Sequence, residues 1–162
     1  MAVVLEERIA QFVAGPAISI AVASRDEHHQ AALFKVVACR VSPARDRVTL
    51  LVDQVFAHEV VRCLRAGFPI AAVFSSPATH RTLQLKGERA EVGPVDTADL
   101  ELARTHGAAI VEHITSLDYP REAVRCYFHY APENLVAVHF TPTAAFEQTP
   151  GPGAGTALEA GA

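Results

Sequence analysis

Residues 33–41 read Leu-Phe-Lys-Val-Val-Ala-Cys-Arg-Val, an apolar run that carries one cation near each end. Its β-branched and aromatic side chains predict a strand, which we place over residues 32–41. Lys35 and Arg40 stand an odd number of positions apart, so a strand would project them to opposite faces. Each cation must then reach solvent, pair with an acid or contact a ligand. The pattern alone favours neither a solvated strand end nor an anion-binding role.

Similar apolar and β-branched runs predict further strands on both sides of this stretch, each bounded by a turn signal. Helical periodicity appears instead in residues 3–13, 56–66 and 95–115. About seven strands without a β-α-β alternation predict a mainly antiparallel β fold with packed helices. The expected strands are residues 17–23, 32–41, 47–53, 70–74, 82–92, 123–130 and 135–140, the last two flanking a hairpin turn at residues 131–134.

The composition argues against several classes of protein. A chain of 162 residues, 50% of them hydrophobic, can bury one substantial core. The net charge of -4 argues against a general nucleic-acid binder, which normally has a basic face. No apolar segment reaches the roughly 18 residues that cross a bilayer, so no membrane partner is expected. Three cysteines without C-x-x-C spacing, and an acidic start unlike a signal peptide, lead us to expect a cytoplasmic protein.

The C-terminal residues differ in composition from the rest. From Gln148 onward the chain consists largely of Gly, Pro, Ala and Thr and has almost nothing to bury. We therefore expect residues 1–147 to form a single domain and residues 148–162 to form an extended arm that ends in a disordered tail.

Motifs for protein-based catalysis are missing from the sequence. The chain carries neither a G-x-S-x-G elbow nor a glycine-rich phosphate loop that opens a helix. The histidines lack the spacing of metal ligands, so no metal site is expected. If the protein is an enzyme, a cofactor is expected to carry the chemistry.

One predicted strand has a distinctly polar face. Thr82, Gln84 and Lys86 share one side of the strand, opposite Leu83 and Leu85. This alternation fits either a solvated outer face or the polar wall of a ligand groove.

At these two strands the chain resembles the pyridoxamine 5'-phosphate oxidase-like, FMN-binding split-barrel family. In that family a basic residue stands at each end of an apolar strand, as in residues 35–40, and a strand, a loop and a helix follow, as in residues 50–64. A strand, a loop and a strand that ends in glycine come next, as in residues 70–87, and residues 146–153 resemble the end of an uncharacterised branch. The resemblance implies a mainly antiparallel split β-barrel that forms a homodimer, with FMN in a cleft at the subunit interface.

The resemblance assigns two groups of strand residues to the flavin. Lys35, Val36 and Val37 would contact it through side chain and backbone. Thr82 falls where the oxidases carry a glutamine that binds the ring, and Gln84 lies two residues further on.

A third group follows the cofactor from its ring to its phosphate. Val52, Asp53 and Gln54 would lie along the ring and the ribityl chain. His58 and Arg62 would lie near the phosphate, at a helix start where backbone N–H groups favour anions.

Two family features are missing from this chain. Where the oxidases carry a Ser-Arg-Lys-like run, this chain reads His58-Glu59-Val60, so Arg62, Lys35 or a residue of the partner chain must hold the phosphate. The C-terminal substrate-binding segment of the oxidases is also missing, so oxidation of pyridoxamine phosphate is not expected.

The resemblance predicts an FMN-binding flavoprotein. We expect an FMN-dependent oxidoreductase in which the flavin transfers a hydride or electrons to or from a small molecule. Two alternatives stay open. One is a non-catalytic protein that binds haem or another cofactor in the same cleft, which the histidine content motivates. The other is a structural or regulatory dimer without a cofactor.

Overall fold

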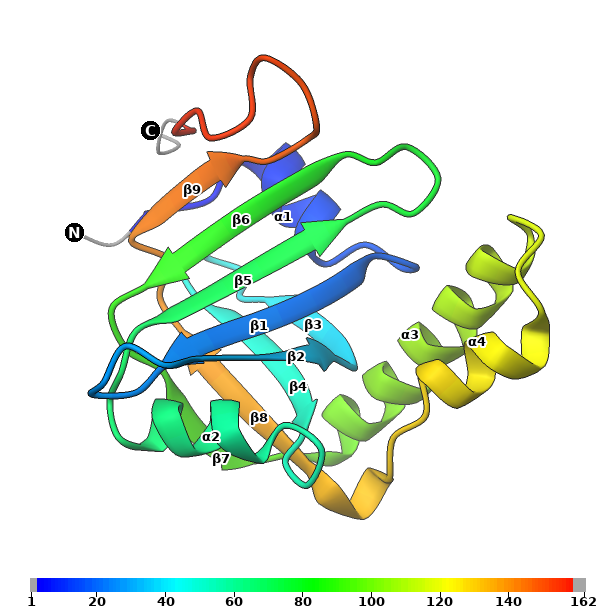
Figure 1. Ribbon diagram of the computed structural model, residues 1–162, viewed down its shortest axis with the longest axis horizontal. Coiled ribbons are helices and arrows are strands. Elements are labelled where there is room, and N and C mark those ends of the chain that lie inside the picture. Colours follow the sequence, from blue (N-terminus) through cyan, green and yellow to red (C-terminus); the bar gives the residue numbers. More distant parts are fainter. Residues whose placement is uncertain (1–2, 159–162) are drawn as a thin grey trace.

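The computed structural model describes residues 3–158 and contains two sheets (Figure 1). Every strand pair among these residues is antiparallel, which confirms the predicted mainly antiparallel β architecture. The first sheet has the order β2-β1-β5-β6-β9, with β1 Ser19–Arg25, β2 Ala31–Val36, β5 Ile70–Ser75, β6 Thr82–Gly87 and β9 Ala144–Glu147. The second has the order β3-β4-β8-β7, with β3 Ala38–Val41, β4 Val48–Asp53, β7 Glu91–Pro94 and β8 Leu135–Phe140.

Two predicted strands are wrong as single elements, because each contributes to both sheets. The strand expected over residues 32–41 bends at Val37, whose N–H donates to the carbonyl oxygen of Leu51 (2.8 Å), and becomes β2 and β3. The strand expected over residues 82–92 likewise ends at Gly87 and resumes as β7. Apolar residues continue across the first break, so the sequence pattern does not mark it, whereas Gly87 and the polar residues after it do mark the second. These two crossings connect one sheet with the other.

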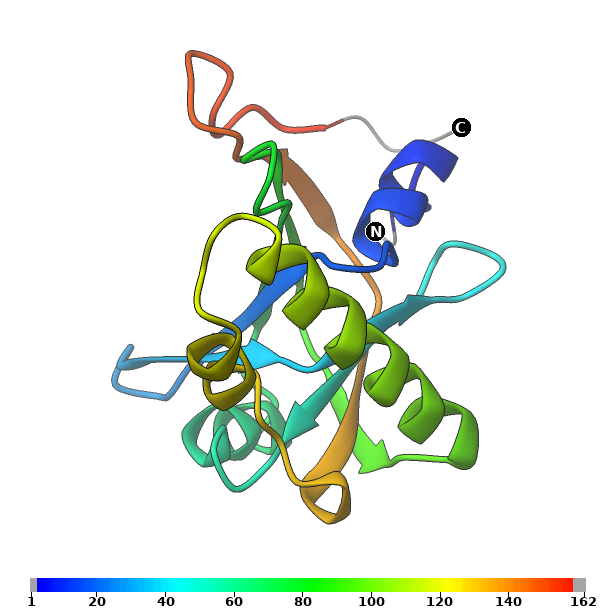
Figure 2. The same cartoon turned by 90° about the vertical axis from the view of Figure 1, so that its right-hand side faces the viewer.

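The described residues also form four α-helices: α1 Glu7–Val13, α2 His58–Arg65, α3 Thr97–Thr115 and α4 Arg121–Tyr127. The three predicted helices are confirmed in type, although α1 begins later than expected. The strand predicted over residues 123–130 is wrong, because this segment forms α4. Pro120 stands at its N-cap, and Val124 and Phe128 turn their side chains inward at helical spacing. Figure 2 shows α4 lying beside α3.

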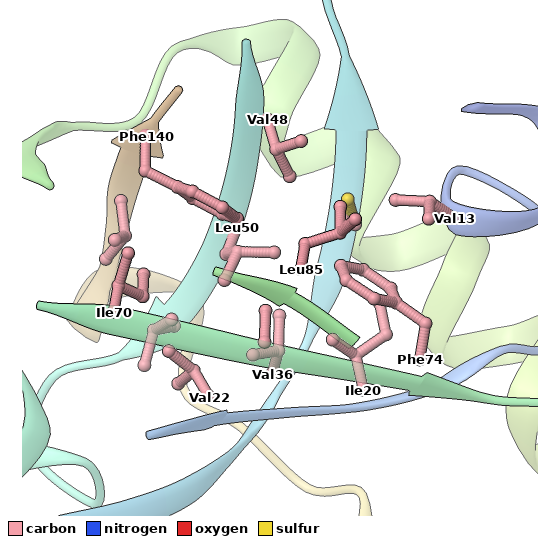
Figure 3. Close-up of a cluster of buried hydrophobic side chains, with 14 of the residues drawn as sticks. Val13, Ile20, Val22, Val36, Val48, Leu50, Ile70, Phe74, Leu85 and Phe140 are labelled. Carbon is pink, nitrogen blue, oxygen red and sulfur yellow. The ribbon is translucent and has the colours of Figure 1, made fainter. Parts of the chain in front are cut away.

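The core lies between the two sheets. Buried residues of the first sheet, such as Val22, Phe74 and Leu85, meet Leu50 and Phe140 of the second (Figure 3). In β1, β5 and β6 buried residues alternate with partly exposed ones, which makes the opposite face of the first sheet an outer face. In Figure 1 this outer face is turned toward the viewer, and no helix lies in front of it.

The C-terminal residues continue the first sheet and then contact it again. β9, which the sequence did not predict as a strand, pairs with β6. The backbone N–H of Gln148 donates to the carbonyl oxygen of Thr82 (2.7 Å), and that of Leu158 donates to Ala145 (2.8 Å). The expected arm therefore lies against its own chain up to residue 158. The remainder of the expected tail, residues 159–162, lies outside the described residues.

None of the described helices is long and apolar enough to cross a membrane.

Gly87 provides a test of the packing between the sheets. A Cβ atom at this position would lie 2.9 Å from Cδ2 of Phe140 and 3.0 Å from Cγ2 of Ile70, both core side chains. We expect Gly87→Ala to lower the free energy of unfolding by about 1–3 kcal/mol, because overpacking forces buried groups apart. Chemical denaturation measures the change. Gly93→Ala is the control, since nothing lies within 4 Å of its added Cβ. An equal loss in both variants would contradict the role of close packing.

Candidate functional site

A cavity of about 690 Å³ lies between the ends of strands β1, β5 and β6 and the helices α3 and α4. Its volume is within the range of small-molecule sites, about 300–1,000 Å³. The strand side is polar and the helix side is apolar and aromatic. The strand side is formed by Ser19, Ser75, Ser76, His80 and Thr82, and the helix side includes Ile114, Leu117, Tyr119, Val124, Tyr127 and Phe128.

The polar wall is fixed by hydrogen bonds among its own residues. The hydroxyl of Thr82 donates to the carbonyl oxygen of His80 (3.0 Å), and the hydroxyl of Ser75 lies 2.9 Å from Oγ1 of Thr82. The N–H of Thr82 donates to Oγ1 of Thr149 (2.9 Å). His80 itself adopts a left-handed backbone conformation with φ 59°, which is uncommon for a residue with a side chain. The wall is thus positioned before any ligand arrives.

Lys35 lies beside this cavity. Its Nζ lies 4.7 Å from the centre of the Tyr127 ring, which lines the cavity, and 5.8 Å from the centre of the Phe34 ring. Partial burial lowers the pKa of Lys35, and the charge of Asp53 acts in the opposite direction. None of the ion pairs among residues 3–158 includes Lys35. Its ammonium group therefore has donors available for a ligand.

The strand order aligns Lys35 with Gln84 on the outer face of the first sheet. Lys35 pairs with Ala21, Ala21 with Val73, and Val73 with Gln84. Three strand spacings separate the ends of this row, about 14 Å. The row therefore has a polar residue at each end and small apolar side chains between them.

A second cavity, of about 320 Å³, lies at the start of α2 and contains two of the predicted residues, His58 and Arg62. The guanidinium of Arg62 donates to Oε2 of Glu59 from Nε (3.0 Å) and Nη2 (2.6 Å). Glu59 also lies 3.5 Å from Nε2 of His58. The rings of Phe34 and Phe56, which line this cavity, stack 6.3 Å apart. The arginine predicted to hold phosphate is therefore already bound to a carboxylate.

Other predicted residues have their side chains inside the protein. Val36 and Val52 are buried in the core. Asp53 is also buried, and accepts hydrogen bonds from the N–H groups of Val55 (3.0 Å), Phe56 (3.3 Å) and Ala131 (3.0 Å). The side chain of Asp53 thus holds two loops together.

Two further predicted residues form hydrogen bonds with residues of β4 and α2. The N–H of Val37 is bonded to Leu51, as described above. Oε1 of Gln54 accepts a hydrogen bond from Nη2 of Arg65 (3.2 Å). The ten predicted residues therefore do not converge on one cavity. Thr82 lines the first, Lys35 lies beside it, and His58 and Arg62 line the second.

The aromatic wall of the first cavity is not predicted from the sequence. The sequence pattern predicts a strand for Tyr127 and Phe128, although Val124 and Phe128 stand four residues apart after Pro120, which is also typical of a short helix. The second cation of the opening stretch, Arg40, donates to Asp99 at the start of α3 (2.7 Å) and is bound within the fold. Within residues 3–158, no three His, Cys, Asp or Glu side chains are grouped so that they could hold a metal ion.

Comparisons with known proteins give matches in structure only: no family model and no curated protein matches the sequence. A putative pyridoxamine 5'-phosphate oxidase from Lactobacillus delbrueckii has a TM-score of 0.54 and 13% identity, over 90% of this chain and 99% of that one. HupZ of Group A Streptococcus has a TM-score of 0.55 and 10% identity, over 93% of this chain and 99% of that one. An F420 reductase has a TM-score of 0.50 and 13% identity, over 88% of this chain and 98% of that one. The chain therefore has the fold of the pyridoxamine 5'-phosphate oxidase-like split-barrel proteins.

Proposed function

We propose that this chain binds a flavin, in the form of FMN, with the ring in the cavity between α4 and the strand ends. The observation that carries the proposal is the contrast between the two walls of that cavity, one polar and one apolar. An isoalloxazine ring has the same contrast, since its pyrimidine edge forms hydrogen bonds and its dimethylbenzene edge does not. The bound flavin would supply hydride or electron transfer to or from a small-molecule substrate, which makes the protein an oxidoreductase.

The residues of the chain would bind and orient the ring. The hydroxyls of Ser75 and Thr82 would meet its polar edge, and Tyr127 and Phe128 would cover its apolar part. The ammonium of Lys35 would donate to the ring from the side of Tyr127 and favour negative charge on it.

We also propose that a second copy of the chain covers the surface around Lys35. Four large apolar side chains surround this part of β2, α4 and the loop before α2, and each is more than half exposed: Leu33 (67%), Val55 (56%), Phe56 (51%) and Tyr127 (63%). An apolar group of this kind is typical of a protein interface. A homodimer that buries it would place the cofactor cleft between two subunits.

The absorbance spectrum of the purified protein, before and after FMN is added, tests the proposal. We expect a flavin spectrum, together with quenching of FMN fluorescence on titration. Lys35→Gln is expected to weaken FMN binding about ten-fold, because a desolvated cation contact is lost. Lys86→Gln is the matched control: Lys86 lies on the same sheet, and its Nζ lies 4.7 Å from the ring centre of Phe146, the same distance as Lys35 from Tyr127. A titration without any spectral or fluorescence change would reject the flavin.

One observation supports haem as a second candidate, because His80 lines the first cavity and could supply an axial ligand. Haem would then give a Soret band that His80→Ala abolishes. A spectrum of added haem that stays unchanged in the presence of the protein would exclude this candidate.

A further inference from the structure

The second cavity has an excess of negative charge. Its charged side chains are the carboxylates of Asp26 and Glu59 and the guanidinium of Arg62, and its lining histidine is His58. With histidine counted as neutral, the carboxylates outnumber the cation by one. A phosphate dianion placed in this cavity would meet more repulsion than attraction.

Asp26 and Glu59 both have bonding partners close in the chain. Oδ1 of Asp26 accepts the N–H groups of His28 (2.9 Å) and Gln30 (2.9 Å) in the turn between β1 and β2. The pKa of Asp26 is lowered, mainly by the bond from Gln30 and to a smaller extent by the charges of His28 and Arg62. Glu59 stands in the first turn of α2, where negative charge is favoured by the helix dipole. Arg62 is one helical turn further on and is bound to Glu59 by two of its nitrogens.

The carboxylate of Glu59 therefore already binds the guanidinium that a phosphate in this cavity would need. A phosphate could recruit Arg62 only by displacing a carboxylate on the same helix, which cannot move far from it. Lys35 does not line the second cavity: its Nζ is closer to the ring of Tyr127, in the first cavity (4.7 Å), than to that of Phe34, in the second (5.8 Å). Among the described residues that line the second cavity, Arg62 is thus the one arginine or lysine, and Glu59 already occupies it.

We infer that this chain recognises a flavin by its ring and not by its phosphate, and that Glu59 is the residue that determines this specificity. The inference rests on the proposed flavin function and adds the class of cofactor tail that the site accepts. FMN and the uncharged riboflavin should bind with similar affinity. Glu59 should weaken the binding of FMN and leave the binding of riboflavin unchanged.

Fluorescence titration of the full-length protein with FMN and with riboflavin tests the inference without any assay of activity. We expect the two dissociation constants to agree within about three-fold, because the ring provides the common contacts. FMN that binds ten-fold or more tightly than riboflavin would overturn the inference and leave the flavin function intact. Failure of both flavins to bind would overturn the inference and the proposed function together.

Variants of the ion pair provide the second test. Glu59→Gln releases Arg62 and should strengthen FMN binding about five-fold while riboflavin binding stays unchanged. The additional change Arg62→Gln should remove this gain. Glu101→Gln is the matched control, because Glu101 and Arg104 form an ion pair with the same spacing and the same 2.6 Å contact on α3. A preference between the two flavins that does not change in Glu59→Gln would overturn the role of Glu59.

Discussion

Replacing Asp53 by alanine is expected to lower the free energy of unfolding by about 3 kcal/mol, because three backbone donors lose a charged acceptor. The carboxylate of Asp53 is 2% exposed and joins the loop before α2 to Ala131, far along the chain. Water cannot replace it without opening both loops, so the N–H groups would stay unpaired or the loops would separate. Denaturant unfolding of the variant and the wild type measures the loss.

Asp46→Ala is a suitable comparison for the Asp53 variant. Asp46 also accepts a side-chain hydrogen bond, from the hydroxyl of Ser42 (2.7 Å), but in an exposed turn. We expect a change within about 0.5 kcal/mol there, as at most surface positions. If Asp53→Ala were equally mild, the carboxylate would be dispensable to the fold. A role in binding a ligand would then explain its position better.

The positions of single strands could be predicted from the sequence, but their membership in two sheets could not. Alternation and β-branching are local properties, and both continue through the bend at Val37. What turns the chain there is a hydrogen bond to Leu51 on another strand, a contact that exists only after folding. The strand prediction for residues 123–130 is wrong for a related reason. The apolar residues of this segment fit both a strand and a helix, and its packing beside α3 decides between them.

The candidate site depends even more on contacts between distant parts of the chain. Lys35 and Gln84 share one row only because β1 and β5 pair between them. No local pattern relates these two positions, although Lys35 could be singled out as a cation in an apolar strand and Gln84 as part of a polar strand face. Thr82 lines the first cavity and Lys35 lies beside it, and both residues could be selected from the sequence. The aromatic wall of that cavity depends on α4, which the sequence did not reveal.

Replacing Asp99 by alanine is expected to lower the free energy of unfolding by about 2–3 kcal/mol, because the ion pair with Arg40 and one of the two bonds of the capping box are lost together. Asp99 accepts from Nε of Arg40 (2.7 Å), and its oxygen also faces the N–H of Asp96 (3.4 Å). The N–H of Asp99 in turn donates to Asp96 (2.7 Å), which completes the capping box of α3. This cluster attaches the longest helix to β3, and the partly exposed guanidinium of Arg40 moderates the loss.

The same carboxylate predicts a dependence on pH. Burial alone would raise the pKa of Asp99, but the hydrogen bonds from Arg40 and Asp96 outweigh it and hold the pKa below its usual value. The pKa of Asp99 is lower in the folded than in the unfolded state, where it is about 3.9. Its ionised carboxylate therefore contributes fully to the free energy of unfolding above the unfolded pKa, and this contribution is lost as the pH falls through the folded pKa. The difference between wild type and Asp99→Asn should therefore stay constant from pH 7 to about pH 5 and shrink below about pH 4.

Denaturation midpoints of both proteins at neutral and acidic pH measure this difference. Glu112→Gln is the control, since its ion pair with Arg121 has the same 2.7 Å separation but is exposed on both sides. Exposed pairs contribute about 0–1 kcal/mol, so this variant should follow the wild type at every pH. A gap between wild type and Asp99→Asn that persists unchanged at pH 3 would show that the shape of the cap, and not its charge, holds α3 on the sheet.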